Sequence, residues 1–360
     1  MKRALISMLG MTLLACSGHT EEPQKESEAM TNYYTRQTRI NDVMNDAVFG
    51  DYGRLIFPVN TGYWSGTTLE QLQLTWYNYI DPDKTVEVCN YFRAHADNCF
   101  IDIYTEAEKQ ANPELRNTGL FFFRGNSNAP FAICNAGGGF SYVGAMHDSF
   151  PHALELSKQG YNAFALIYRP GDAYEDLARA ITFVCDHANE LGVAPIGYSL
   201  WGGSAGARMA ATLGNSSYLR QLTGRTDLPQ ASAVIMQYTG YTTVSQYDGS
   251  TYACCGTSDG IASWRTMQSR LESLSALGIP TEFHSYNGLP HGFGLGTGTV
   301  AEGWINDAVR FWQSQPGSTA VRSIKADTRQ SVAIYSHNGT RRNAMQKGIN
   351  IVDGRKVAVK

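Results

Sequence analysis

The chain contains 360 residues, and its 29 Lys and Arg residues against 32 Asp and Glu residues give a formal net charge of −3 at pH 7. A balance this close to neutral provides no general electrostatic case for binding nucleic acid. Glycine is frequent, at 36 residues, so a short glycine-containing motif is weak evidence until its surroundings support it.

The first 32 residues indicate where the protein is located. A basic pair at residues 2–3 precedes a mostly apolar stretch over residues 4–15, which predicts a secretory signal peptide over residues 1–15, too short to span a bilayer comfortably. The stretch ends in Leu13-Leu14-Ala15-Cys16, which resembles a bacterial lipobox. The resemblance implies cleavage before Cys16 and lipid attachment to its thiol; the alternative is an ordinary signal peptide with an incidental cysteine.

Residues 16–32 are polar and acid-containing and show no periodicity, so they predict a disordered tether. We therefore expect the protein outside the cytoplasm, lipid-anchored to the cell envelope or exposed at the surface of a Gram-negative bacterium. Contact with a membrane is expected only through the lipid anchor.

Residues 33–118 do not follow the alternation of strands and helices seen later in the chain, and they hold clustered aromatic side chains. Such rings bury a large apolar area and still offer polar edges, so they suit either core packing or a wall that faces a sugar. A strand predicted over residues 118–123 follows, and we expect the segment before it to cover one side of a cleft. The clustered residues are Tyr63, Trp64, Trp76, Tyr77 and Tyr79.

Residues 119–315 alternate strand and helix patterns. A helix is predicted from Asp172 to Gly192, and others over residues 205–213 and 301–312. This alternation predicts an α/β fold with a mostly parallel sheet that helices cover on both faces. Strands are predicted over residues 131–134, 163–168, 198–201, 233–238, 252–255 and 282–286.

Ser204 lies in the sequence Gly-Gly-Ser-Ala-Gly at residues 202–206, between a predicted strand and a predicted helix. A serine in such a sharp turn is exposed and reactive, and its glycine neighbours let strand and helix pass closely because they have no Cβ. The pattern and its context predict that Ser204 is a nucleophile.

Three successive glycines follow the strand over residues 131–134, within Asn-Ala-Gly-Gly-Gly-Phe at residues 135–140. Such a loop can turn backbone N–H groups toward a ligand. We assign the amides of Gly138 and Gly139, with that of Ala205, to the negative charge that develops on a carbonyl oxygen during nucleophilic attack. The plain alternative is a flexible glycine-rich loop.

An acid and a histidine follow Ser204 in the chain. Asp259 ends a turn directly after the strand over residues 252–255, and His291 lies in a glycine- and proline-containing loop after the next strand. Carboxyl ends of parallel strands face ligands in open α/β sheets. We therefore predict that His291 acts as the base for Ser204, and that Asp259 fixes its tautomer and stabilises the imidazolium.

Other titratable residues compete less well for these roles. His284 lies in the middle of a predicted strand, and Asp248 lies in a polar turn before the strand that carries the acid. His147, Asp148 and His152 follow the glycine loop closely enough to suggest a metal site.

The stronger interpretation of that last group is a helix N-terminus, capped by Asp148 or Ser149, with Pro151 in its first turn. An indirect role for His147 beside the site stays open. We expect no metal and no cofactor, because the sequence has neither a phosphate-binding loop motif nor a cysteine and histidine spacing suited to zinc.

Residues 119–315 resemble the esterase and lipase group of the α/β-hydrolase superfamily, particularly secreted carbohydrate esterases of the acetyl-xylan and feruloyl type. The glycine loop matches the His-Gly-Gly-Gly motif of that group, with Ala136 at the histidine position, and Ser204, Asp259 and His291 match its catalytic triad. The resemblance implies the α/β-hydrolase fold and a serine esterase that removes acetyl or feruloyl groups from plant-type polysaccharide or oligosaccharide through an acyl-enzyme.

Two other functions stay open. One is a lipase or serine peptidase of the same fold, which would keep the triad and change the cleft. The other is a surface glycan-binding lipoprotein without turnover. The expected partner is a small-molecule or oligosaccharide ester, and not nucleic acid.

Six cysteines remain after Cys16. Cys89 and Cys99 lie close enough in the chain to close a small disulfide-bonded loop, an option that the sequence leaves open. The others are expected as free, buried thiols without a nucleophilic role: Cys134, Cys185, Cys254 and Cys255.

The C-terminal residues 316–360 differ in composition, since residues 321–360 hold nine Lys and Arg against two Asp and Glu. Alternating apolar and polar residues around Asp353-Gly354 predict a β-hairpin over residues 348–360, and Asn338-Gly339 offers another turn. We expect a small β module. It resembles the sorting tails of some secreted Gram-negative proteins, which implies removal or anchoring outside the cell.

Overall fold

The computed structural model describes residues 33–317 and, further along the chain, residues 334–336, 341–342, 348–352 and 355–359. The predicted signal peptide, the lipidation site Cys16, the tether over residues 16–32 and the Asn338-Gly339 turn lie outside the described residues. In the part that is described, no helix is long and apolar enough to cross a membrane.

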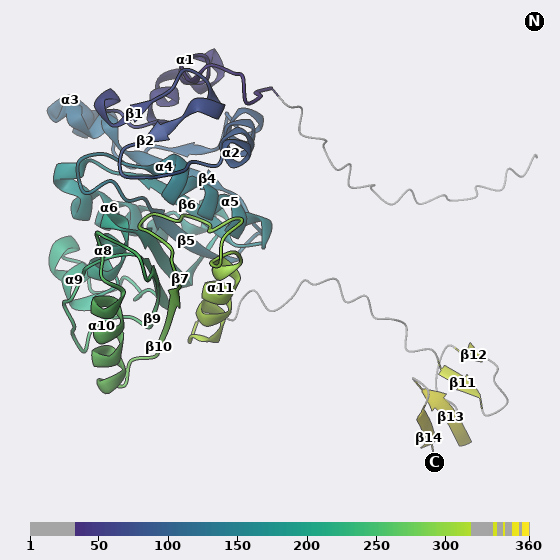
Figure 1. Ribbon diagram of the computed structural model, residues 1–360. Helices are drawn as coiled ribbons and strands as arrows, with labels where there is room; N and C mark the ends of the chain where they lie inside the picture. Colours follow the sequence, from purple (N-terminus) through teal and green to yellow (C-terminus); the bar gives the residue numbers. More distant parts are fainter. Residues whose placement is uncertain (1–32, 318–333, 337–340, 343–347, 353–354, 360) are drawn as a thin grey trace, which may run out of the picture.

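An eight-stranded sheet forms the centre of the molecule (Figure 1), in the order β10-β9-β8-β7-β5-β6-β4-β3. The strands from β10 to β6 run parallel, whereas β4 and β3 each pair antiparallel with their neighbours. The strands are β3 (Phe100–Ile101), β4 (Gly119–Phe123), β5 (Pro130–Asn135), β6 (Asn162–Ile167), β7 (Ala194–Gly203), β8 (Ala233–Gln237), β9 (Thr251–Gly256) and β10 (Thr281–Tyr286).

Helices cover both faces of this sheet. In Figure 1, α6, α8, α9 and α10 lie on one side of the strands, and α5 and α11 lie on the other. The predicted α/β architecture is therefore confirmed. The helices are α1 (Ile40–Met44), α2 (Pro82–Ala94), α3 (Glu106–Ala111), α4 (Ala145–Asp148), α5 (Phe150–Lys158), α6 (Ala173–Asp186), α7 (Ala188–Leu191), α8 (Ala205–Leu213), α9 (Ser216–Thr223), α10 (Trp264–Ala276) and α11 (Trp304–Ser314).

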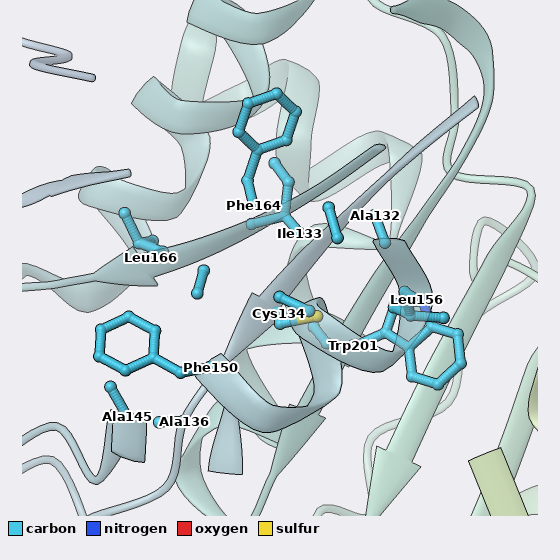
Figure 2. Close-up of a cluster of buried hydrophobic side chains, with 14 of the residues drawn as sticks. Ala132, Ile133, Cys134, Ala136, Ala145, Phe150, Leu156, Phe164, Leu166 and Trp201 are labelled. Carbon is cyan, nitrogen blue, oxygen red and sulfur yellow. The ribbon is translucent and has the colours of Figure 1, made fainter. Parts of the chain in front are cut away.

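The core lies between the central strands and these helices. Every residue of β5 and of β6 is buried, as expected for parallel strands that helices cover on both faces. Figure 2 shows Ile133 and Phe164 from these strands, together with Trp201 of β7 and Phe150 and Leu156 of α5. This packing fixes the carboxyl ends of β5 and β7, where the glycine loop and Ser204 follow.

The helix predicted from Asp172 to Gly192 divides into two. α6 ends at Asp186 and α7 ends at Leu191, where Gly192 takes a left-handed conformation with φ of 69°. Asp172 occupies the N-cap position without a capping hydrogen bond, and its carboxylate instead pairs with Arg169. The periodicity identified the packing surface, because, apart from the half-buried Leu191, the apolar residues that recur along this stretch are buried: Leu177, Ile181, Val184 and Ala188.

Residues 33–118 form short helices, 3₁₀ turns and a two-stranded ladder of β1 (Trp64–Ser65) and β2 (Gln73–Leu74). The edge strand β3 pairs with β4, so the sheet also draws on residues that precede 119. Cys89 and Cys99 are both buried, free thiols, and the disulfide that their spacing allowed is not formed. The Cys99 sulfur instead lies 3.6 Å from the Tyr52 hydroxyl.

The described C-terminal strands form a separate four-stranded antiparallel sheet in the order β12-β11-β13-β14. β13 pairs with β14 so that Val352 lies opposite Arg355, which confirms the predicted hairpin. Its role as a sorting element stays a prediction. The strands are β11 (Ile334–Ser336), β12 (Arg341–Arg342), β13 (Gly348–Val352) and β14 (Arg355–Val359).

Candidate active site

Ser204 occupies the sharp turn between β7 and α8. Its backbone has φ of 53° and ψ of −115°, a strained conformation for a residue with a side chain. The Ser204 amide donates to the Gln237 carbonyl over 2.9 Å, which ties the turn to β8. A Cβ on Gly202 would collide with the backbone of Gly206, and one on Gly206 with the carbonyl of Asn135. The flanking glycines are therefore required by close backbone packing.

His291 lies between Ser204 and Asp259. Its Nε2 is 3.1 Å from the Ser204 Oγ, and its Nδ1 is 2.8 Å from the Asp259 Oδ2. Because an ionised carboxylate only accepts hydrogen bonds, Nδ1 carries the proton and Nε2 is left to accept from the serine hydroxyl. The structure thus brings together the three residues that the sequence analysis singled out.

The side chain of Asp259 is fully buried and accepts from four hydrogen-bond donors. Its Oδ1 accepts from the amides of Ile261 at 2.8 Å and Ala262 at 2.7 Å, while its Oδ2 accepts from His291 and from the Cys255 thiol at 3.6 Å. Burial alone would raise the pKa of Asp259, but the hydrogen bonds from His291 and Ala262 outweigh it and hold that pKa below its ordinary value. The carboxylate therefore stays ionised beside His291.

The thiol of Cys255 was expected as a passive core group. Its contact with Asp259 was not anticipated, and only its position near the end of the strand that leads to the acid could have indicated it. Burial raises the pKa of Cys255, so the thiol remains protonated and acts as a donor.

The glycine loop follows β5 in a conformation that suits glycine. Gly138 and Gly139 have φ of 127° and 60°, and a Cβ on Gly138 would collide with the Tyr142 carbonyl. Among the described residues, the amides of Gly138, Gly139 and Ala205 have no hydrogen-bond partner. Gly138 and Gly139 line the same cavity as Ser204, so their amides are available for a ligand there.

This cavity has a volume of about 300 Å³. Trp76 and Tyr77 form part of its wall, and Ile261, which follows the acid, forms another part. Its remaining lining is His291, Ser204 and the glycine loop. Larger cavities occur elsewhere on the described surface, but neither Ser204 nor His291 lines them. The position of the reactive groups therefore identifies the relevant cavity better than volume does.

Asp148 has a different role from the one that the sequence suggested. It lies at the end of α4 and caps no helix; Ser149 holds the N-cap position of α5 without a capping hydrogen bond. Its buried carboxylate accepts hydrogen bonds from the Tyr77 hydroxyl at 2.6 Å, the Gly137 amide at 3.1 Å and the Tyr238 hydroxyl. Local capping statistics could not foresee this, because two of the three donors lie far away in the sequence.

These contacts connect the glycine loop to the loop that carries His291, residues 287–294, which we call the histidine loop. Burial and the neighbouring Asp148 raise the pKa of both Tyr77 and Tyr238, so both phenols keep the proton that they donate. Tyr238 also accepts from the Gly294 amide at 3.3 Å, and its ring packs edge-on against His291 at 4.9 Å. Asp148 therefore fixes groups on both sides of Ser204.

His147 contacts the histidine loop directly. Its Nε2 donates to the Gly292 carbonyl over 2.8 Å, and its ring lies 4.6 Å from that of Tyr77. His152 is buried, and burial lowers its pKa to about 4, so it is neutral at physiological pH. In the described part of the chain, no group of three His, Cys, Asp or Glu residues is placed to hold a metal ion.

The remaining competitors have partners of their own. His284 contacts Glu282 at 2.6 Å, and Asp248 forms a buried ion pair with Arg270 at 3.1 Å. Neither lines the cavity around Ser204. Both side chains are accounted for by these local contacts.

Comparison with known proteins gives a family match and several similar structures. Residues 124–255, which include the glycine loop and Ser204, match the family model described as BD-FAE, an esterase family of α/β hydrolases. No curated protein matches the sequence.

Among solved structures, an acetyl ester-xyloside bifunctional hydrolase from Caldicellulosiruptor lactoaceticus is 19% identical, with a TM-score of 0.51 over 60% of this chain and 95% of its own. MGS-M1, an alpha/beta hydrolase from a Medee basin deep-sea metagenome library, is 22% identical, with a TM-score of 0.48 over 59% of this chain and 95% of its own. Thermogutta terrifontis esterase 2 is 21% identical, with a TM-score of 0.47 over 54% and 88%.

The family match and the sheet topology confirm the resemblance to esterases of the α/β-hydrolase superfamily. The similarity to the structure from Caldicellulosiruptor lactoaceticus supports the fold alone, because its identity is low.

Proposed function

We propose that this chain, a serine hydrolase with the α/β-hydrolase fold, is an esterase that removes acetyl or feruloyl groups from plant-type polysaccharide or oligosaccharide. The observation that carries the proposal is the pair of contacts from His291, at 3.1 Å to the Ser204 Oγ and 2.8 Å to the Asp259 Oδ2, at the wall of a cavity. In our proposal these three residues form the catalytic triad.

In the first step, His291 Nε2 accepts the proton of the Ser204 hydroxyl as its oxygen attacks the ester carbonyl. Asp259 holds the imidazole in the required tautomer and stabilises the positive charge that develops on it. The strained backbone of Ser204 supports this role, because such strain is retained where the surrounding structure serves a site.

The carbonyl oxygen becomes negatively charged during the attack. The unpartnered amides of Gly138, Gly139 and Ala205 are the donors that we assign to it. Donors of this kind stabilise the transition state more than the substrate, and losing one costs on the order of 10²–10³ in rate.

Collapse of the tetrahedral intermediate expels the alcohol, which takes the proton from His291 and leaves an acyl group on Ser204. His291 then removes a proton from water, the hydroxide oxygen bonds to the acyl carbon, and the Ser204 oxygen leaves with its proton restored. The products are a carboxylic acid and the free alcohol, and no cofactor takes part in either half.

Two observations support an ester on a sugar over an ester of a long-chain fatty acid. A cavity of about 300 Å³ lies at the lower limit of ligand pockets, which suits a short acyl group better than a long alkyl chain. Trp76, at the wall of this cavity, is 49% exposed, and exposed aromatic side chains at a site commonly contact ligand.

Hydrolysis of p-nitrophenyl acetate, butyrate and octanoate, and of a feruloyl ester, tests the proposal, with Ser204→Ala as the control. We expect turnover of acetate or the feruloyl ester, and a loss of about 10⁴-fold or more in kcat for Ser204→Ala with the fold retained. Activity that rises with chain length would instead indicate a lipase. No turnover of any ester would favour a peptidase or a glycan-binding protein.

We further propose that the protein acts outside the cytoplasm, anchored through lipid on Cys16. The support is the sequence of residues 1–16 alone. Incorporation of labelled palmitate in a Gram-negative host, with Cys16→Ala as the control, tests this location: unchanged incorporation in the variant would contradict it.

A further inference from the structure

Trp76 combines two properties that are rarely found together. Its backbone has φ of 72°, in the left-handed region that bulky side chains avoid, and its side chain is 49% exposed. The free energy gained by burying an indole could offset the cost of this backbone conformation, but about half of the Trp76 surface stays in contact with water. Strained residues cluster at ligand sites, so the conformation requires an explanation other than core packing.

Three hydrogen bonds hold the residues on either side of Trp76 in place. The Thr75 amide donates to the Tyr63 carbonyl over 2.9 Å, and the Tyr142 hydroxyl donates to the Thr75 carbonyl. On the other side, the Tyr77 hydroxyl donates to Asp148 over 2.6 Å. The strained residue is thus fixed from both neighbours.

Two tyrosine rings and the glycine loop also pack against the indole of Trp76. Its ring lies 5.9 Å from that of Tyr63 and 5.7 Å from that of Tyr142, and those two rings stack on each other at 4.9 Å. A Cβ on Gly139 would lie only 2.9 Å from the indole, so the ring fits against the glycine loop because residue 139 has no side chain. The six-membered ring of the indole is therefore packed against the glycine loop.

Trp76 lines the same cavity as Ser204 and His291. Its indole N–H has no hydrogen-bond partner among the described residues, so it is available to a ligand. A ligand at this ring must offer an apolar face and polar edges, since one surface of the site is aromatic and the other is wet. A pyranose has this shape, with axial C–H bonds on its face and hydroxyl groups around its edge.

An alkyl chain fits the same ring less well. Ile261, on the cavity wall, is 66% exposed, so a chain along the rim would stay largely in water and gain little from burial. The half-exposed indole of Trp76, which packs against neighbouring rings, instead suits a flat and hydroxylated ligand.

We propose that Trp76 is a stacking platform for the pyranose ring that carries the ester. The glycine loop and the hydrogen bonds of Thr75 and Tyr77 hold Trp76 in position. This inference rests on the proposed function, because it names the alcohol part of the same ester. It assigns substrate recognition to the N-terminal segment, outside residues 124–255 of the family match.

Calorimetric titration of the full chain with xylotetraose tests the platform without any ester. We expect Trp76→Ala to weaken binding at least about tenfold and Trp76→Phe to weaken it less, since Phe keeps an aromatic face. Tyr247→Ala is the matched control, because Tyr247 is 48% exposed and does not line the cavity, and it should bind as the wild type does. Trp76→Gly, which accepts the same backbone without strain, provides a second variant if Trp76→Ala fails to fold.

Hydrolysis of acetylated xylo-oligosaccharide separates the two proposals. If the wild type cleaves it and Trp76→Ala shows an unchanged KM, the platform is wrong and the esterase stands. If no ester is cleaved but xylotetraose binding depends on Trp76, sugar binding at Trp76 stands and the esterase is wrong. Absence of wild-type binding, or a Trp76→Ala defect restricted to p-nitrophenyl octanoate, overturns the platform.

Discussion

Two buried carboxylates near Ser204 differ in the groups that they contact. Asp259 is held by backbone amides two and three residues further along the chain, and it contacts His291 directly. Asp148 is held by Tyr77, Tyr238 and the Gly137 amide, and it contacts none of the proposed triad residues. In the proposed mechanism, the first orients the proton carrier His291, while the second fixes the loops around it. Burial alone therefore does not distinguish an acid of the triad from an acid that positions a loop.

The largest effect is expected from Asp259→Asn. The amide can donate to Nδ1 and so favours the wrong tautomer of His291, which leaves Ser204 without a base. We expect kcat for p-nitrophenyl acetate to fall about 10⁴-fold, with a changed dependence of kcat/KM on pH. A loss of less than tenfold would show that His291 does not depend on Asp259.

A smaller loss is expected from Asp148→Asn, which keeps the size of the side chain but gives it an amide where three donors converge. The Gly137 amide and the loop that carries Gly138 should shift, and kcat should fall about 10²-fold. The midpoint of the pH profile should stay in place, in contrast to Asp259→Asn. If both variants change that profile alike, the two carboxylates do not have separate roles.

Tyr238→Phe tests a single hydrogen bond of the Asp148 network, because it removes one donor to Asp148 and keeps the ring beside His291. The loss of one hydrogen bond of about 1 kcal/mol predicts a fall in kcat of roughly fivefold. Tyr247→Phe is the control, since the exposed Tyr247 lies outside the cavity. Equal kcat values for the two variants would remove Tyr238 from the network.

The smallest effect concerns stability in acid. The pKa of Asp259 is held below its ordinary value of 3.8, so its hydrogen bonds stabilise the folded state above that value, and the contribution is lost as the pH falls through the lowered pKa. Urea unfolding at pH 6 and at pH 3 should show a greater loss of stability for the wild type than for Asp259→Asn. An identical loss in both proteins would mean that the pKa of Asp259 is the same in the folded and unfolded states.

The sequence predicted the core of the proposed site because its signals are local. Strand and helix periodicity located β5, β7 and α8, and turn residues placed Ser204, Asp259 and His291 at the carboxyl ends of strands. The network of Asp148 was missed because Tyr77 and Tyr238 are 71 and 90 residues away. Trp76 was left between core packing and a sugar-facing wall, since only the folded chain shows its exposure and its strained backbone.

The hydrogen bond between Tyr77 and Asp148 has a consequence for how this protein can change over evolution. It joins the wall of the cavity, which comes from the N-terminal segment, to the acid that fixes the glycine loop. A substitution that reshapes the wall at residue 77 is therefore expected to shift the glycine-loop amides that we assign to the developing negative charge as well. New substrates are more readily accommodated through Trp76 or Ile261, whose side chains have no hydrogen bond to that acid, than through Tyr77, where a gain in recognition carries a loss in rate.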